Sequence, residues 1–359
     1  MRIAIIAPGL HRVQRGAEVA LESIGRELAR FDGVEVTLFG SGYPRPNEPY
    51  NFIHVGNIDR QTFERWPRIP ILRNEYVYEE LTFLPQLIYR YHPQDFDFTL
   101  TCSYPFTNWW LRRGENSPAH VFVTQNSDYP AICDNSEYKW FGCEGLICTN
   151  QEYFERNKAR WTSCLITNGV NAETFSPQPV ARNQFALPDD VPIALMVSAL
   201  IPSKRILEGI QAVAQLPEWH LVICGDGPLR HQVSEMGETL MPRRLHLKKL
   251  SHEQMPDIYR IADVFLHLSI DEPFGNVYLE ALATGLPIVA HNRDVTRWIL
   301  EDTSILVDTT EPSQIIQAIQ TAISQKTSEA INHRRCVIEQ RFTWRAIGQQ
   351  YLNFLTQLN

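Results

Sequence analysis

The sequence predicts an α/β protein of two doubly wound, Rossmann-like domains whose parallel sheets face an interdomain cleft. Three observations lead to this prediction. Short apolar runs alternate with helix-like segments, which is typical of parallel strands joined by helices on both faces of a sheet. The alternation occurs in two series, which a segment with four prolines separates. A length of 359 residues, of which 44% are apolar, also favours two packed units over one.

The first domain is expected over residues 1–170. An apolar run at 2–7 reads as a strand, and an amphipathic helix at 16–31 leads from it to a second strand, which makes one βαβ unit. The strands expected in this domain lie at 2–7, 34–39, 97–102, 120–124, 145–149 and 163–167.

A proline-rich segment at 171–192 is expected to link the domains, and the second domain to cover 193–340. Its strands are expected at 193–199, 220–225, 244–248, 263–268, 286–290 and 304–308. The chain ends in an amphipathic segment with one strong apolar face, so we expect a helix over 342–359 that packs back onto the first domain.

Composition narrows the class of function. A formal net charge of −8 argues against a nucleic-acid partner, which selects for basic surfaces. The seven cysteines include no CxxC pair, so neither a disulfide framework nor a structural zinc site is indicated, and a cytoplasmic location is expected. No apolar run approaches the length of a spanning helix.

The stretch DEPFGNVYLEALATGLPIVA at 271–290 carries the clearest chemical signal. It follows an expected strand, and a helix is predicted to begin at Gly275 or Asn276 and to end at Gly285. The first amides of a helix lack intrahelical partners and bear the positive end of its dipole. The amides of Phe274 to Asn276 are therefore expected to hold a phosphate, and Gly275 to let it come close.

Two glutamates, Glu272 and Glu280, flank this anion site. A carboxylate touching a diphosphate would repel it, so both are expected to accept hydrogen bonds from hydroxyls. Glu280 lies one helical turn after Asn276 and suits a ribose, whereas Glu272 lies on the other side of the phosphates. An anion site between two hydroxyl sites matches a nucleoside diphosphate sugar.

At this point the chain resembles a known family. The spacing of Glu272 and Glu280 is similar to the E-x7-E signature of the retaining family 4 glycosyltransferases, which have the GT-B fold. Further stretches agree with the family in order along most of the chain; they lie at 8–18, 168–177, 197–205, 224–228 and 259–269.

The resemblance implies roles for several residues. Lys204 would bind the donor diphosphate, with a charge-assisted hydrogen bond of about 1.5 to 3 kcal/mol. Gly16 would let its loop approach the phosphates from the first domain. The base would rest near Lys249 and Leu250. Glu280 would bind the ribose and Glu272 the donor sugar.

The sequence departs from the family at two positions. The usual arginine beside the diphosphate is Ala199 here, so one cation is missing unless Arg205 replaces it. A histidine of the first domain that typically lies near the donor sugar appears as Asn126, with Gln125 beside it. An amide can donate to a sugar or phosphate oxygen, but it cannot act as a titrating base.

The resemblance implies a retaining hexosyltransferase of polysaccharide assembly, with UDP-glucose as the expected donor and a saccharide or lipid-linked glycan as acceptor. The mechanism usually proposed for the family is departure of the nucleotide from the front face, with no protein nucleophile. Lys204, Glu272 and Asn126 would support the developing charges, and no metal or cofactor is expected. A nucleotide-sugar 2-epimerase of the same fold and a non-catalytic nucleotide-sugar binder remain alternatives.

Aromatic and basic side chains mix at 60–73 and 108–114 in the first domain. One reading is peripheral contact with a lipid-linked acceptor at the inner membrane surface. The other is an ordinary pair of loops with solvated arginines, which the negative net charge favours.

Overall fold

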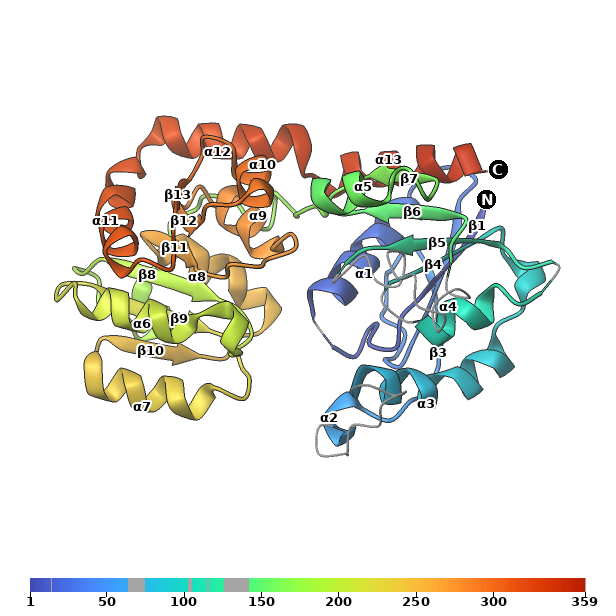
Figure 1. The fold of residues 1–359 in the computed structure, drawn as a ribbon, viewed down its shortest axis with the longest axis horizontal. Helices are drawn as coiled ribbons and strands as arrows, with labels where there is room; N and C mark the ends of the chain where they lie inside the picture. The colour runs from blue at the N-terminus through green and yellow to red at the C-terminus, as the bar shows by residue number, and fades with distance from the viewer. Residues whose placement is uncertain (14, 64–74, 103–104, 115, 126–141, 359) are drawn as a thin grey trace. The chain divides into compact units, whose positions relative to one another are not determined.

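The chain forms two compact units, which Figure 1 draws as ribbons. The computed structural model describes residues 1–13, 15–63, 75–102, 105–114, 116–125 and 142–358. Unit 1 comprises Met1–Asn168 and Trp344–Asn359, and unit 2 comprises Gly169–Thr343. Each unit is built on its own sheet of parallel strands, so the predicted α/β fold with two parallel sheets is confirmed.

Within the described residues, the sheet of unit 1 has seven strands in the order β3-β2-β1-β4-β5-β6-β7. They are β1 (Arg2–Ile6), β2 (Glu35–Gly40), β3 (Asn51–His54), β4 (Phe98–Thr101), β5 (Ala119–Val123), β6 (Gly145–Cys148) and β7 (Ser163–Leu165). The helices are α1 (Gly16–Leu28), α2 (Arg60–Phe63), α3 (Glu75–Arg90), α4 (Pro105–Leu111), α5 (Gln151–Asn157) and α13 (Trp344–Leu358), with a 3₁₀ turn at Pro93–Asp95. The edge strand β3 was not predicted, because four residues of mixed polarity give no clear alternation.

The C-terminal helix α13 packs against α1 in unit 1. The two backbones approach closely at Gly348, where an added Cβ would lie 2.9 Å from the Cβ of Glu27. The apolar face of α13 is buried in the same cluster as β1 and α1, through Ile347, Tyr351, Phe354 and Leu355.

The described sheet of unit 2 has six strands in the order β10-β9-β8-β11-β12-β13. They are β8 (Ile193–Val197), β9 (His220–Cys224), β10 (Leu245–Lys248), β11 (Val264–His267), β12 (Ile288–His291) and β13 (Ile305–Val307). The helices are α6 (Ile206–Ala214), α7 (Arg230–Leu240), α8 (Met255–Ile261), α9 (Asn276–Ala283), α10 (Asp294–Leu300), α11 (Pro312–Ala322) and α12 (Ser328–Arg341). Short 3₁₀ turns lie at Arg182–Phe185, Pro202–Lys204, His252–Gln254 and Ile323–Gln325.

Helices cover both faces of this sheet. Successive residues of β8 point to opposite faces, so Ile193 and Leu195 belong to one buried cluster and Ala194 and Met196 to another. The first cluster contains residues of α8, α9, α10 and α12, and the second contains residues of α6, α7 and α11. Both faces being buried explains why these strands are nearly continuous apolar runs.

The segment 171–192, expected to link the domains, packs onto unit 2. Phe175, Phe185 and Leu187 are buried in the cluster that also contains α8 and α9. Arg182 donates to the main-chain oxygens of Ile261 and Val191, among other acceptors. None of the described helices is both long and apolar enough to cross a membrane.

Candidate active site

Two loops of unit 2 leave its sheet at the point where the strand order reverses. β8 and β11 are hydrogen-bonded neighbours, yet β9 lies on the far side of β8 and β12 on the far side of β11. Parallel strands end at the same edge, and such a switch point is where open α/β sheets bind ligands. The loop after β8 carries Lys204, the loop after β11 carries Glu272, and these side chains meet.

Helix α9 begins at Asn276, directly after Gly275, as the sequence predicted. Gly275 has φ of 78°, a left-handed conformation that favours glycine. An added Cβ there would also lie 2.7 Å from the ring of Tyr278 and 3.0 Å from Cγ of Glu272. At the other end, the predicted stop at Gly285 is confirmed by a Schellman pair of main-chain hydrogen bonds.

Phe274 anchors the loop that leads to α9. Its side chain is 2% exposed, and its ring lies 6.5 Å from that of Phe342, nearly edge to face. The ring therefore faces the core, and any ligand contact by Phe274 falls to its main chain.

Glu272 lies in a buried ionic cluster. Its Oε2 accepts from Nζ of Lys204 at 2.5 Å and from Nε2 of His267 at 2.9 Å. Burial alone would raise the pKa of this carboxyl, but the hydrogen bond and charge of His267, together with Lys204, outweigh burial and lower the pKa to about 2. Glu272 is therefore an ionised carboxylate at neutral pH.

Our sequence analysis did not identify His267 as a site residue. Its side chain is 4% exposed, at the last position of β11. Since a carboxylate is purely an acceptor, the facing Nε2 carries the proton. The one available signal was a histidine within the otherwise apolar run VFLHL, at the carboxyl end of a central strand.

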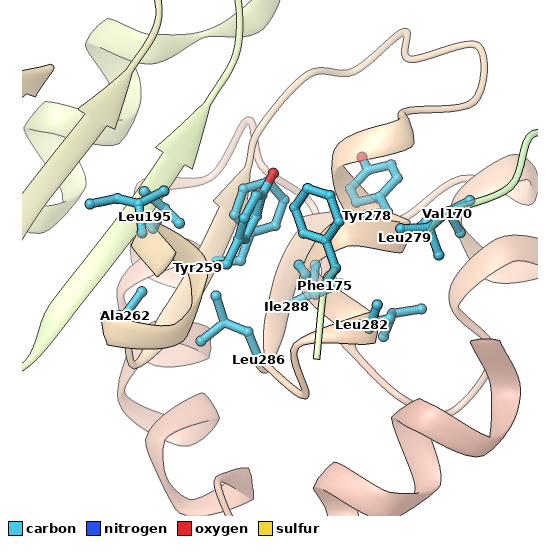
Figure 2. Close-up of a cluster of buried hydrophobic side chains, with 14 of the residues drawn as sticks. Val170, Phe175, Leu195, Tyr259, Ala262, Tyr278, Leu279, Leu282, Leu286 and Ile288 are labelled. Atoms are coloured by element: carbon cyan, nitrogen blue, oxygen red, sulfur yellow. The ribbon is translucent and has the colours of Figure 1, made fainter. Parts of the chain in front are cut away.

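Glu280 lies on α9, eight positions after Glu272, and its Oε2 accepts from the hydroxyl of Tyr259 at 2.7 Å. Burial raises the pKa of Glu280 to about 7, although the bond from Tyr259 acts in the opposite direction. Figure 2 shows the ring of Tyr259 among apolar side chains, which include Leu195, Leu286 and Ile288. This cluster fixes the donor, so Tyr259 orients the carboxyl group at Oε2.

The other unit 2 residues predicted for the donor lie in the same two loops or after β10. Arg205 follows Lys204 with φ of 53°, and its guanidinium contacts the main-chain oxygen of Thr309 at 3.1 Å and Glu208 at 3.4 Å. Lys249 is mostly exposed and pairs with Asp226 at 2.6 Å. Leu250 is partly buried against the core cluster, and Ala199 is exposed.

The predicted residues of unit 1 are described within that unit. Gly16 is exposed and is the first residue of α1. Gln125 follows β5, and its amide exchanges two hydrogen bonds of 2.9 Å with the amide of Asn168. Asn126 lies outside the described residues, so its predicted role stays a prediction. In the part of the chain that the structure describes, no three His, Cys, Asp or Glu side chains form a potential metal site.

Comparison with known proteins agrees with this geometry. Residues 177–340 match the family model "Glycosyl transferases group 1". The chain is similar to the lipopolysaccharide core biosynthesis glycosyltransferase LpsE of Rhizobium meliloti, with 28% identity over 49% of this chain and 53% of LpsE. It is also similar to the lipopolysaccharide 1,2-N-acetylglucosaminetransferase of Salmonella typhimurium, with 26% identity over 55% of this chain and 57% of the relative. The chain thus spans about half the length of these relatives.

Solved structures resemble the whole chain. Sucrose-phosphate synthase from Thermosynechococcus elongatus superposes with a TM-score of 0.80 at 22% identity, covering 99% of this chain and 98% of that one. Anabaena HepE, solved in complex with UDP-glucose, gives a TM-score of 0.76 at 17% identity, covering 99% and 100%. Residues 177–340 therefore belong to the group 1 glycosyl transferases, and the two parallel sheets give the chain the GT-B fold.

Proposed function

We propose that this chain is a retaining, metal-independent glycosyltransferase that transfers a hexose from a nucleotide-sugar to a saccharide or lipid-linked glycan acceptor. The observation that carries the proposal is the arrangement around the start of α9. A buried Lys204–Glu272–His267 cluster lies on one side, and Glu280 with its oriented carboxyl group lies further along the helix. These groups offer cationic and acceptor functions at the switch point of the sheet.

The donor groups divide among these residues by charge. The diphosphate would lie at the amides of Phe274 to Asn276 and at Nζ of Lys204, where both the helix dipole and the ammonium favour an anion. The ribose hydroxyls would donate to Glu280, and a hydroxyl of the sugar to Glu272. Gly16, Gln125, Lys249 and Leu250 complete the proposed donor contacts.

The same groups explain how transfer would be accelerated. As the glycosidic bond breaks, negative charge grows on the leaving diphosphate, and a fixed ammonium and helix amides stabilise that charge more than the ground state. The ionised Glu272 would favour the positive character of the sugar in the transition state. Neither role requires a protein nucleophile or a metal.

UDP-glucose is the donor that we propose. HepE, whose fold this chain shares, was solved with UDP-glucose, and several relatives are named for lipopolysaccharide biosynthesis. Those names support polysaccharide or lipopolysaccharide assembly as the setting of this proposal.

Incubation with UDP-glucose, in the presence of a chelator and without an acceptor, tests the proposal. A transferase should release UDP slowly by hydrolysis, and faster with an acceptor. A new epimer of the sugar would instead favour a 2-epimerase. Tight binding with no UDP release, even with acceptors, would favour a binding protein. A thermal-shift panel of UDP, GDP and ADP sugars identifies the donor, since a ligand that binds the folded state raises its melting temperature.

Peripheral contact with the inner membrane surface is part of the proposal for the acceptor. At the end of α4, the guanidinium of Arg113 lies 4.4 Å from the ring centre of Trp109, and Arg113 is exposed. Most of the second aromatic and basic segment, 60–73, lies outside the described residues. Co-sedimentation with anionic vesicles, compared with neutral vesicles, tests this contact.

A further inference from the structure

Glu272 has two cationic or hydrogen-bonding partners that differ in freedom of movement. Both act on the same oxygen, Oε2. Lys204 is 22% exposed in its side chain and reaches the carboxylate through a flexible stem, whereas His267 is 4% exposed. The imidazole is held between Tyr278, edge to face at 4.9 Å, and Phe265, nearly parallel at 6.2 Å. Lys204 can therefore move, and His267 is fixed.

We propose that His267 is a positioning residue that keeps Glu272 ionised and in place when the donor diphosphate draws Lys204 away from it. This inference rests on the proposed function, because it assumes a diphosphate at Lys204. In the free protein Lys204 and His267 share Oε2. In the donor complex Lys204 turns to the phosphates, and His267 alone holds the carboxylate that receives the sugar hydroxyl.

The energetic argument concerns the buried charge left behind. Separating one partner from a buried ion pair is costly because the other charge remains uncompensated. Glu272 is 8% exposed, so without a second partner it would either retain Lys204 or take up a proton. A fixed N–H donor at 2.9 Å removes both penalties, and Lys204 becomes available to the donor at little cost.

The other charged groups near Glu272 cannot take this role. The guanidinium of Arg293 pairs with Asp271 at 2.9 Å and faces the main-chain oxygen of Glu272 at 3.5 Å. The hydroxyl of Tyr278 is buried and makes no hydrogen bond to any described residue. Lys204 and His267 are the groups that bond the carboxylate among the described residues.

Titration of His267→Leu with UDP tests the inference. Calorimetry in buffers of different ionisation enthalpy gives both the affinity and the number of protons taken up on binding. At pH 8 the variant should bind UDP about tenfold more weakly than the wild type, and the deficit should shrink toward pH 5.5. Over that range the variant should take up as much as about one proton more than the wild type. Protonation of UDP itself is common to both proteins and cancels in the difference.

Two further variants sharpen the result. His267→Gln keeps an N–H donor without a titrating ring and should recover part of the affinity, and it carries the test if His267→Leu does not fold. Tyr278→Phe is the matched control: it keeps the ring against His267, removes a hydroxyl that bonds no described residue, and should behave as the wild type.

The outcomes separate this inference from the proposed function. Wild-type protein that binds neither UDP nor another nucleoside diphosphate would overturn both. Wild-type binding with the same affinity and proton uptake in both His267 variants would overturn the role of His267 and leave the proposed function standing. Weaker binding with no change in proton uptake at any pH would also overturn it, since a merely structural defect has that signature.

Discussion

The hydroxyl of Tyr259 donates a 2.7 Å hydrogen bond to Oε2 of Glu280 and thereby joins α8 to α9. The phenol is buried in the core cluster of unit 2, so the bond fixes one carboxylate oxygen from the apolar side. The other oxygen is left to accept from a ligand. The same burial raises the pKa of Glu280 to about 7, which gives a pH dependence that can be measured.

Glu280→Gln should change the pH dependence of stability. An acid whose folded pKa of about 7 exceeds its ordinary value of 4.5 retains its proton in the folded state at pH values where the unfolded chain has lost it. The wild type should therefore lose stability as the pH rises from about 4.5 to 7, by up to about 3 kcal/mol. The glutamine variant should show a flatter profile in this window, in melts of unit 2. Glu235→Gln, on an exposed site of the same unit, is the control; parallel profiles for all three proteins would contradict the assigned pKa.

Alanine substitutions at the two glutamates should affect different steps. Glu280→Ala removes the proposed ribose acceptor and should weaken UDP binding by about tenfold. Glu272→Ala releases Lys204 for the phosphates, so UDP should bind at least as well, while transfer slows by about a hundredfold. Calorimetry with UDP and release of UDP from UDP-glucose measure the two effects. Small and equal changes in both variants would refute the division of roles.

Lys204→Ala should mainly reduce nucleotide affinity. A lost charge-assisted hydrogen bond of about 1.5 to 3 kcal/mol corresponds to a Kd increased by about 10- to 150-fold. The comparison of UDP with uridine is decisive, because uridine lacks the phosphates and should bind the variant as it binds the wild type. Lys158→Ala, at a surface pair with Glu155 in unit 1, is the control for loss of a lysine. An equal loss of affinity for uridine would place Lys204 away from the phosphates.

Local signals explain which parts of this site could be predicted from sequence. The start of α9 at Gly275 and its end at Gly285 depend on a few neighbouring residues, and both were predicted. All six described strands of unit 2 were predicted as well, because burial on both faces makes them apolar throughout. The strand β3 of unit 1 was missed for the converse reason: at an edge, a short strand carries little apolar pattern.

The ionic contacts depend on the order of the strands and could not be predicted. Lys204 and Glu272 are 68 positions apart and meet because β8 and β11 are adjacent. Tyr259 is 21 positions from Glu280, on a different helix. His267 resembles a residue of a buried strand until the fold turns Glu272 back onto it. Periodicity identifies elements, but it contains no information on which loop ends meet.

Gly275→Ala tests whether the entry to α9 is built for close packing. The glycine has φ of 78°, and the new Cβ would meet the ring of Tyr278 at 2.7 Å and Cγ of Glu272 at 3.0 Å. Gly33 offers a matched control, because its φ is 75° but nothing lies within 4 Å of an added Cβ. Gly33→Ala should therefore show the cost of the left-handed backbone alone, about 1 to 2 kcal/mol, with UDP binding unchanged.

Gly275→Ala should cost more than its control, because contact with Tyr278 and Glu272 adds to the backbone strain. It should also weaken UDP binding and slow release of UDP from UDP-glucose, since relief of the contact displaces the carboxylate and the first amides of α9 together. Melting temperatures and UDP calorimetry on both variants separate the two contributions. Equal destabilisation of the two variants, with full UDP binding in each, would show that Gly275 serves the turn and not the ligand site.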